Sequence, residues 1–225
     1  GKLAEIARIL DDMGVTVVPQ SEFGVSDADE TGTTFVENAL IKARHAAEAT
    51  GLPAIADDSG ICVDALDGRP GVYSARYSGP GATAESNNER LLAELEGIPE
   101  EQRGAAFHCV ACYVDPGMDE PVIAQGEWRG RILHERRGDG GFGYDPLFYV
   151  PELGRSSAEL SPQEKNARSH RGIALRALVD LLNGTEIDLS VIAAWALGRM
   201  GDPAAVAPLR EALDSQFRSL QLHSV

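Results

Sequence analysis

The chain is short of cysteine, of aromatic residues and of positive charge. Three cysteines in 225 residues form no disulfide framework, which is typical of a protein kept in a reducing cytoplasm. Aromatic residues make up 6% of the chain, and 20 Lys and Arg stand against 35 Asp and Glu, a net charge of −15. General binding of nucleic acid needs a basic surface, so this balance argues against a nucleic-acid partner. An anionic substrate would have to meet a local group of cations.

Long apolar runs are also missing. No stretch approaches the roughly 20 apolar residues of a membrane-spanning helix, and no signal-peptide pattern is visible. We therefore expect no membrane partner and a cytoplasmic location. The content of hydrophobic residues, 43%, and of charged residues, 24%, is ordinary for a folded protein, and the length suits one large domain or a domain with an appendage.

Apolar periodicity and turn residues predict an α/β fold. The expected helices span 2–13, 34–50 and 83–95, and the expected strands span 15–18, 53–56, 61–65, 105–114 and 121–133. Thr34 can cap the second helix and Gly51 can end it. The last two strands are joined by a short turn, which indicates an antiparallel pair. We expect a mixed, twisted sheet flanked by helices.

The segment 140–160 begins with a glycine-rich turn that carries aromatic residues. Phe142 and Tyr144 offer flat faces to a heterocycle, and the glycines at 140, 141 and 143 allow close approach of the backbone. The alternative is a glycine-rich turn without a ligand. These two interpretations are about equally favoured by the turn alone.

The segment 161–172 supports a binding site. Ser161 as N-cap, Pro162 at the first helical position and Glu164 closing a capping box predict where a helix begins. This start places Lys165, Ser169 and Arg171 at known spacing on the helix and the segment that follows it, and a binding site is the favoured interpretation. Charged Lys, His and Arg offer only hydrogen-bond donors, which suits phosphate or a carbonyl oxygen. For Lys165 alone, the alternative is an ordinary surface lysine.

Two neighbouring carboxylates follow an apolar run. Asp57 and Asp58 are predicted at a strand end, where ligands collect in open α/β sheets. Adjacent strand residues point to opposite faces, so one of the two should face the cleft. Glu30 is the candidate second carboxylate of such a site, with Glu37 and Asp29 as alternatives, although a solvated acid is the commoner role.

Cys109 and Cys112 form a CxxC motif that could indicate metal or redox chemistry. The surrounding run is rich in strand-forming residues, and residues three apart on a strand point to opposite faces. A structural role is therefore the favoured interpretation.

The character of the sequence changes after Gly184. The run VIAAWALGRMGDPAAVAPLREALDS resembles one HEAT-like repeat, with Gly201, Asp202 and Pro203 as the turn between two helices. We expect a first unit at 1–184 and a partial helical hairpin at 185–225. A plain helical hairpin that closes the domain is the alternative. Such repeats need neighbours to bury their apolar faces.

Five segments together resemble the inosine/xanthosine triphosphate pyrophosphatases, and the bacterial members most of all: GKLAEIARIL, TGTTFVENALIKARHAA, PAIADDSGICVDALDGRPGVYSARYSG, GGFGYDP and SPQEKNARSHRG. They occur in the family's order from Gly1 to about Gly184. Family members begin with a strand and a Thr/Ser-Gly-Asn-x-Gly-Lys loop, of which only Gly1 and Lys2 are present here. An N-terminally clipped domain is therefore expected.

The resemblance implies an enzyme that hydrolyses ITP, dITP and XTP to the monophosphate and pyrophosphate, with Mg²⁺ as cofactor and a homodimer as assembly. It implies Asp58 as the catalytic residue that holds Mg²⁺ with Glu30 or orients water. The implied substrate-binding residues are Lys2, Ser59, Phe142, Gly143, Tyr144, Asp145, Lys165, His170 and Arg171. Lys2 and Lys165 would bind phosphate, while His170 or Arg171 would donate to the keto oxygen at purine position 6. A catalytically inactive nucleotide-binding module and a pyrophosphatase for other nucleotides are the alternatives.

Overall fold

The computed structural model describes residues 2–184 and a strand at 193–196. Its α-helices are α1 (Lys2–Asp11), α2 (Phe35–Thr50), α3 (Ala84–Glu94), α4 (Pro162–Arg168) and α5 (His170–Asn183). Its strands are β1 (Val17–Pro19), β2 (Ala54–Val63), β3 (Gly104–Val114), β4 (Val122–Ile132), β5 (Phe148–Val150), β6 (Arg155–Ser156) and β7 (Ala193–Ala196).

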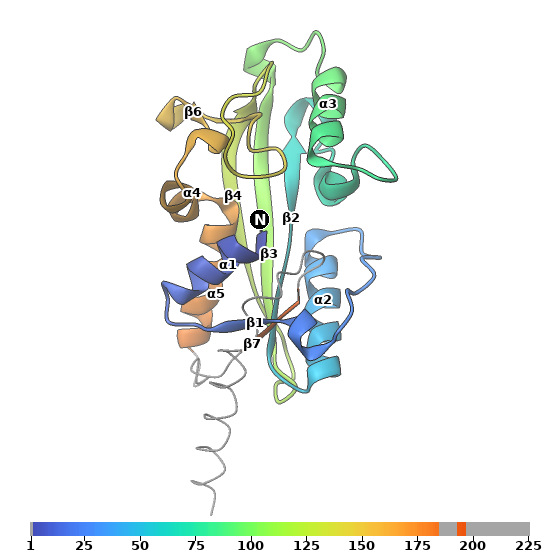
Figure 1. Ribbon diagram of the computed structural model, residues 1–225, viewed down its shortest axis with the longest axis vertical. Helices are drawn as coiled ribbons and strands as arrows, with labels where there is room; N and C mark the ends of the chain where they lie inside the picture. Colours follow the sequence, from blue (N-terminus) through green and yellow to red (C-terminus); the bar gives the residue numbers. More distant parts are fainter. Residues whose placement is uncertain (1, 185–192, 197–225) are drawn as a thin grey trace, which may run out of the picture.

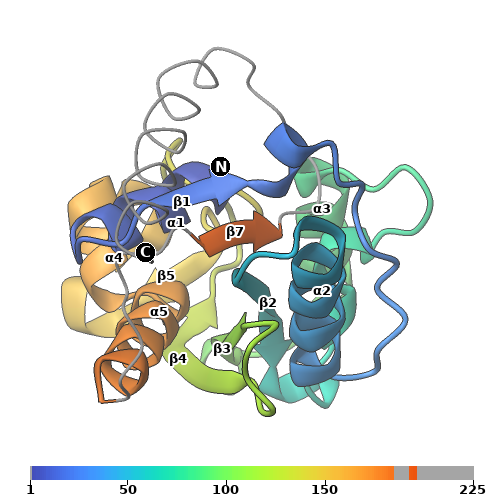
Figure 2. The ribbon, with the colours of Figure 1, turned by 90° about the horizontal axis from the view of Figure 1, so that it is seen from below.

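One mixed sheet runs through the described part of the chain. The strand order is β1-β7-β2-β3-β4-β5-β6. Neighbours from β2 to β6 are antiparallel, whereas β7 pairs in parallel with both β1 and β2. Helices α1, α4 and α5 lie on one side of the sheet and α2 and α3 on the other, as Figures 1 and 2 show. The predicted mixed sheet flanked by helices is confirmed.

Alternation along the strands divides the core between the two faces. Ile55 and Cys109 pack with α1 and α5 in one apolar cluster, and Ala56 and Cys112 pack with α2 in another. This follows from the period of two along a strand. Both cysteines are buried and free, as the structural interpretation of the CxxC motif predicted.

The predicted helix boundaries agree closely with the structure. Thr34 forms a capping box with Glu37 and begins α2, which ends at the left-handed Gly51. Ser161 forms a capping box with Glu164 and begins α4, with Pro162 at its start. These signals act within a few residues, so they could be recognised from sequence.

The predicted break in the sheet at Asp57–Gly60 is wrong. β2 continues through this segment, and β3 pairs with every residue from Ala54 to Val63. The two aspartates are therefore in mid-strand. The continuous ladder is compatible with their charges because cations from other elements meet both carboxylates.

The predicted helix over the apolar run near residue 195 is also wrong where the structure describes it. Ala193–Ala196 form β7, and Ala194 lies opposite both Val18 of β1 and Ala54 of β2. Unpaired strand edges offer hydrogen-bonding groups to any extended segment, which accounts for this conformation. The other residues of the predicted hairpin, and the proposed boundary after Gly184, lie outside the described residues. Within the described ranges, none of the helices has the length and apolarity needed to cross a bilayer.

Candidate active site

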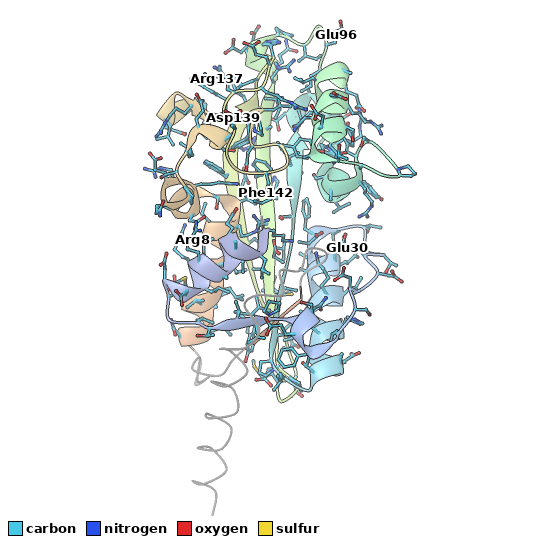
Figure 3. All side chains as sticks on the ribbon, viewed as in Figure 1. Arg8, Glu30, Glu96, Arg137, Asp139 and Phe142 are labelled. Carbon is cyan, nitrogen blue, oxygen red and sulfur yellow. The ribbon has the colours of Figure 1, made fainter. Side chains whose placement is uncertain are left out.

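A cavity of about 340 Å³ lies beside the middle of β2. All the predicted site residues line it: Lys2, Glu30, Asp58, Ser59, Phe142, Gly143, Tyr144, Asp145, Lys165, His170 and Arg171. Lys42, Asn87 and Phe107 also line it, and none of these was predicted. Figure 3 labels Phe142, on the loop before β5, and Glu30, on the loop before α2. The structure thus brings together residues separated by up to 169 positions in the sequence.

The close approach of a neighbouring turn explains the glycine of the Asp-Asp-Ser-Gly motif. A Cβ at Gly60 would lie 2.3 Å from the carbonyl oxygen of Gly71 and 2.5 Å from Oγ of Ser74. Both belong to the 3-10 turn Gly71–Arg76, which lines the cavity at Ser74. Glycine is therefore required for this turn to pack against β2.

The acidic side of the cavity is organised by Lys42. Its Nζ lies 2.9 Å from Oδ1 of Asp58 and 3.1 Å from Oε1 of Glu30. Asn38 donates from Nδ2 to the other oxygen of Asp58, at 3.2 Å. Burial raises the pKa of Asp58, against the lowering effect of Lys42. Burial would lower the pKa of Lys42, but the neighbouring carboxylates raise it above its ordinary value.

Sequence reasoning missed Lys42, although one signal was available. Asn38 and Lys42 are four residues apart in a predicted helix, so they share a face. An amide and an ammonium on an otherwise alanine-rich face suggest a polar site beneath it. The competing candidate Glu37 has a different role, since its Oε2 accepts from the backbone N–H groups of Thr33 and Thr34. Neither Glu37 nor Asp29 lines the cavity.

Asp57 is fully buried on the opposite face of β2 and neutralises two site cations. Its carboxylate lies 2.7 Å from Nζ of Lys2 and 3.2 Å from Nε of Arg171. Arg171 also contacts Oε1 of Glu5 at 3.0 Å and donates to Oγ of Ser59 at 2.7 Å. Burial would raise the pKa of Asp57, but Lys2 and Arg171 hold it well below its usual range. Asp57 and Glu5 were not predicted, because such contacts cross between distant elements.

The glycine-rich turn is braced by Asp145. One of its oxygens accepts from the backbone N–H of Phe142 at 2.7 Å and from Nζ of Lys165 at 2.6 Å, while the other accepts from Oγ of Ser157 at 2.8 Å. Phe142 is 39% exposed, and its ring centroid lies 4.5 Å from Nζ of Lys165. Tyr144 is buried instead, and its hydroxyl donates to the carbonyl of Ser74. Of the two aromatic residues, Phe142 is the one that offers an open face.

His170 begins α5 at the inner wall of the cavity. Ser169 caps this helix by accepting from the N–H of Gly172. The pKa of His170 is well below its ordinary value because the ring is buried, and nearby Arg171 and Lys165 lower it further. The imidazole is therefore neutral, in contrast to the charged donor considered from sequence, and one ring nitrogen still carries a proton.

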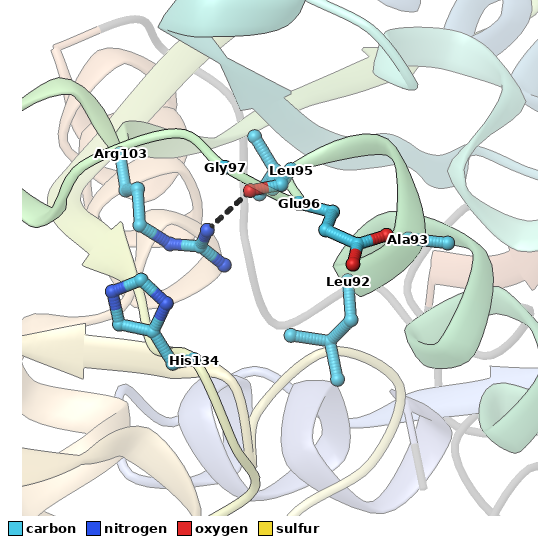
Figure 4. Close-up of a pocket in the computed structure, with 7 residues that line it drawn as sticks. All are labelled: Leu92, Ala93, Leu95, Glu96, Gly97, Arg103 and His134. Atoms are coloured by element: carbon cyan, nitrogen blue, oxygen red, sulfur yellow. Dashed lines mark hydrogen bonds between the residues drawn. The ribbon is translucent and has the colours of Figure 1, made fainter.

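A second cavity, of about 290 Å³, lies beyond the C-terminal end of α3 (Figure 4). Its most buried polar residue is Arg103, which donates to the carbonyl oxygens of Leu95 at 2.7 Å, Ile132 at 2.9 Å and Leu133 at 3.0 Å. Arg103 thereby ties α3 to the end of β4. None of the predicted site residues lines this cavity. The chemistry-bearing side chains are concentrated at the first cavity.

Three chemical features meet at the first cavity. Lys2, Lys42, Lys165 and Arg171 together suit a polyanion such as a triphosphate. Asp58 and Glu30 converge on one cation, here the ammonium of Lys42. The exposed face of Phe142 suits a planar base. Together they fit a nucleotide with its phosphates near the two carboxylates.

Known proteins give an independent comparison. The Ham1 family model matches residues 1–181, and a model of the PBS lyase HEAT-like repeat matches residues 191–215. The dITP/XTP pyrophosphatase of Pectobacterium atrosepticum is 56% identical over 183 residues, 81% of this chain and 93% of that protein. The one from Thioalkalivibrio sulfidiphilus is 58% identical over 185 residues, 82% and 94% of the two chains. A HAM1 protein structure from Coxiella burnetii has a TM-score of 0.75 and 51% identity, covering 82% of this chain and 94% of that one.

Proposed function

The chain belongs to the Ham1 family, and on that premise we propose that it hydrolyses the non-standard purine nucleoside triphosphates ITP, dITP and XTP to the monophosphate and pyrophosphate. The observation that carries the proposal is the single cavity in which four cations, the carboxylates of Asp58 and Glu30, and the exposed ring of Phe142 meet. Catalysis of phosphoryl transfer depends mostly on positioning and on neutralising charge, which these groups can supply.

Magnesium fits the acidic side of the cavity. Asp58 and Glu30 already converge on one positive group, since both contact Nζ of Lys42. Mg²⁺ is usually held by one or two carboxylates together with substrate phosphates and water, so this pair suffices. Among the described residues, no group of three or more His, Cys, Asp or Glu side chains forms an all-protein metal site. Asp58 and Glu30 would hold Mg²⁺, which would neutralise charge on the phosphates.

The protein's own residues have separable roles in the proposed reaction. Asp58, at the end of the cavity where Mg²⁺ would be held, orients a water molecule toward a phosphorus atom and accepts its proton. Lys2 and Lys165 bind phosphate oxygens. Arg171 holds Ser59 toward the cavity through their 2.7 Å hydrogen bond. Asp145 keeps Phe142 and Lys165 in place, so the base and phosphate sites are fixed by one carboxylate.

Selection of the base follows from hydrogen-bond donors. Hypoxanthine and xanthine present an oxygen at position 6, whereas adenine presents an amino group. A hydrogen-bond donor from His170 or Arg171 pairs with this oxygen. It cannot pair with the amino group of adenine, which is also a donor, and a buried donor left unpaired costs about 1–3 kcal/mol. Sites built on such hydrogen bonds discriminate strongly. Stacking on Phe142 adds about 1–3 kcal/mol without preference for any base.

The proposal is tested by product analysis with ITP, dITP, XTP and ATP in the presence of Mg²⁺. We expect pyrophosphate from the first three and slow turnover of ATP. Asp58→Asn should reduce kcat by about 10²-fold or more, the scale of a lost general base, with a smaller change in KM. Orthophosphate as the only product, or equal turnover of ATP, would contradict the proposal. An inactive protein that still binds ITP would instead indicate a nucleotide-binding module.

The family resemblance also supports a homodimer in the cytoplasm. Light scattering coupled to size-exclusion chromatography tests the dimer, which should have twice the mass of the 24.0 kDa chain.

A further inference from the structure

Phe107 and His170 form a stacked pair at the inner wall of the cavity. Their ring centroids are 4.7 Å apart and their planes differ by 10°. Both line the cavity, and they are 8% and 4% exposed, respectively. They come from β3 and from the first residue of α5, so the stack is a contact between the sheet and a helix.

The backbone of His170 is fixed independently of this stack. A Cβ at Gly126 of β4 would lie 2.1 Å from the carbonyl oxygen of His170, so the start of α5 is pressed directly against the sheet. The remaining freedom is rotation of the imidazole about its own side-chain bonds. Rotation about the terminal bond to an aromatic ring is broad, so the ring plane has to be set by its neighbours.

Phe107 sets that plane and is itself held from behind. Its ring packs on Phe148 at 4.6 Å with a 56° tilt, and Phe148 packs on Trp128 at 5.1 Å with a 57° tilt. These tilted contacts are favoured geometries for aromatic pairs. Phe107 is thus the last member of an aromatic array that begins in the core and ends at the imidazole.

The imidazole lines the cavity and has a ring nitrogen without a partner in the described part of the chain. Nδ1 of His170 is buried and has no hydrogen-bond partner among the described residues. An unpaired buried polar atom costs about 1–3 kcal/mol, which a ligand group can recover. Hydrogen bonds of an imidazole lie in the plane of its ring. The plane that Phe107 imposes therefore determines the direction in which His170 can contact a base.

We propose that Phe107 is a specificity-determining positioning residue, which orients the imidazole of His170 toward the edge of the purine base and so contributes to the preference for 6-oxo purines. The proposal rests on the proposed function. Phe107 acts through His170, without a hydrogen bond of its own to the base.

The test compares Phe107→Leu with Phe148→Leu. Both remove a ring from the same aromatic array, but the ring stacked on His170 is that of Phe107. We expect Phe107→Leu to lower the ratio of kcat/KM for ITP to that for ATP by about tenfold, the change that 1.4 kcal/mol produces. Phe148→Leu should lower the melting temperature and leave this ratio unchanged. Phe107→Tyr, which retains the ring, should keep the wild-type ratio.

A second measurement reports on His170 in the free protein. The ring protons of His170, assigned with His170→Gln, should show a ring-current shift that disappears in Phe107→Leu and persists in Phe148→Leu. Its titration should move toward an ordinary histidine pKa in Phe107→Leu. The charged groups that also act on the pKa of this imidazole are Arg171, Lys165, Asp57 and Lys2. All four are retained in the wild-type protein, in Phe107→Leu and in Phe148→Leu.

The outcomes separate this inference from the proposed function. If the His170 signals change but the ITP to ATP ratio does not, Phe107 has no role in specificity. If the ratio falls equally in both leucine variants, the effect is general loosening and the inference is wrong. If Phe107→Leu does not fold, Phe107→Met gives the same comparison with a flexible side chain of similar length.

If the wild-type protein does not turn over ITP, the proposed function fails, and the specificity role of Phe107 fails with it. The resonance measurement then still reports whether Phe107 orients the imidazole.

Discussion

Lys42 occupies the place between two carboxylates where a divalent cation would be held. Its ammonium lies 2.9 Å from Asp58 and 3.1 Å from Glu30, so it neutralises both when no nucleotide is bound. Two unpaired carboxylates in a largely buried site would repel each other. Lys42 also lines the cavity, and in the proposed reaction it would bind the phosphates once Mg²⁺ binds the carboxylates.

This arrangement predicts opposite effects of Lys42→Gln on metal binding and on turnover. Without the ammonium, Mg²⁺ should bind the nucleotide-free protein about tenfold more tightly, because nothing competes for the carboxylates. Turnover of ITP should fall by about tenfold or more, because a cation is lost from the phosphate site. Calorimetric titration with Mg²⁺ and steady-state kinetics measure the two effects. Arg44→Gln, the same charge change at an exposed position of α2, is the control and should alter neither.

At the scale of single elements, β7 is a strand in a segment for which the sequence pattern predicted a helix. It is hydrogen-bonded on both sides, to β1 and to β2, and it links these two strands within the sheet. β7 pairs with β2 from Ala54 to Ala56. The site begins at the next two residues of β2, Asp57 and Asp58, just beyond the end of this pairing. Along β2, the residues that pair with β7 therefore support the sheet, and the residues that serve the site follow directly after them.

Ala194→Pro tests the role of β7. Proline lacks the backbone N–H and is poorly tolerated inside a sheet. We expect the melting temperature to fall by several degrees, given that 1 kcal/mol corresponds to about 2–4 °C in a chain of this size. Hydrogen exchange should accelerate at Val18 and Ala54, the partners of Ala194. Ala194→Ser keeps the N–H and serves as control. Unchanged exchange in the proline variant would show that the segment does not pair in solution.

At the scale of the whole molecule, one buried ionic network joins the sheet to the helices on one of its faces. Asp57 of β2 contacts Lys2 of α1 and Arg171 of α5, and Glu5 of α1 contacts Arg171 as well. The N-terminal helix and the C-terminal part of the site are held together through this network. Removing one partner of a buried ion pair typically costs about 3–5 kcal/mol, because a charge is left uncompensated.

Asp57 therefore predicts a pH-dependent stability. Its folded pKa is held below the unfolded value of about 3.9, so its contribution is fully present above that value and is lost as pH falls through the folded pKa. Asp57→Asn should lower the free energy of unfolding by about 3 kcal/mol at pH 7. The difference from wild type should shrink below about pH 4. Urea unfolding at several pH values measures it, with exposed Asp12→Asn as a control that changes little.

Local patterns determined a large part of this protein. The capping boxes at Thr34 and Ser161 begin helices where the sequence placed them, and the antiparallel pair of β3 and β4 has nearly the predicted bounds. The residues of the Gly-rich turn and of the Ser161 helix do share one cavity, as their chemistry suggested. These features depend on side chains within a few positions of each other, so they can be recognised without coordinates.

The tertiary structure decided the rest, because the deciding contacts connect distant elements. Strand β2 passes through two aspartates without a break because Lys2, Lys42 and Arg171, up to 114 positions away, neutralise their charges. The apolar run at Ala193–Ala196 is compatible with a helix by itself and becomes a strand when two open edges lie beside it. The sequence determines which residues can carry a charge and which segments can pair as strands. The burial of each residue and its distance from the others arise only on folding, and these determine its role.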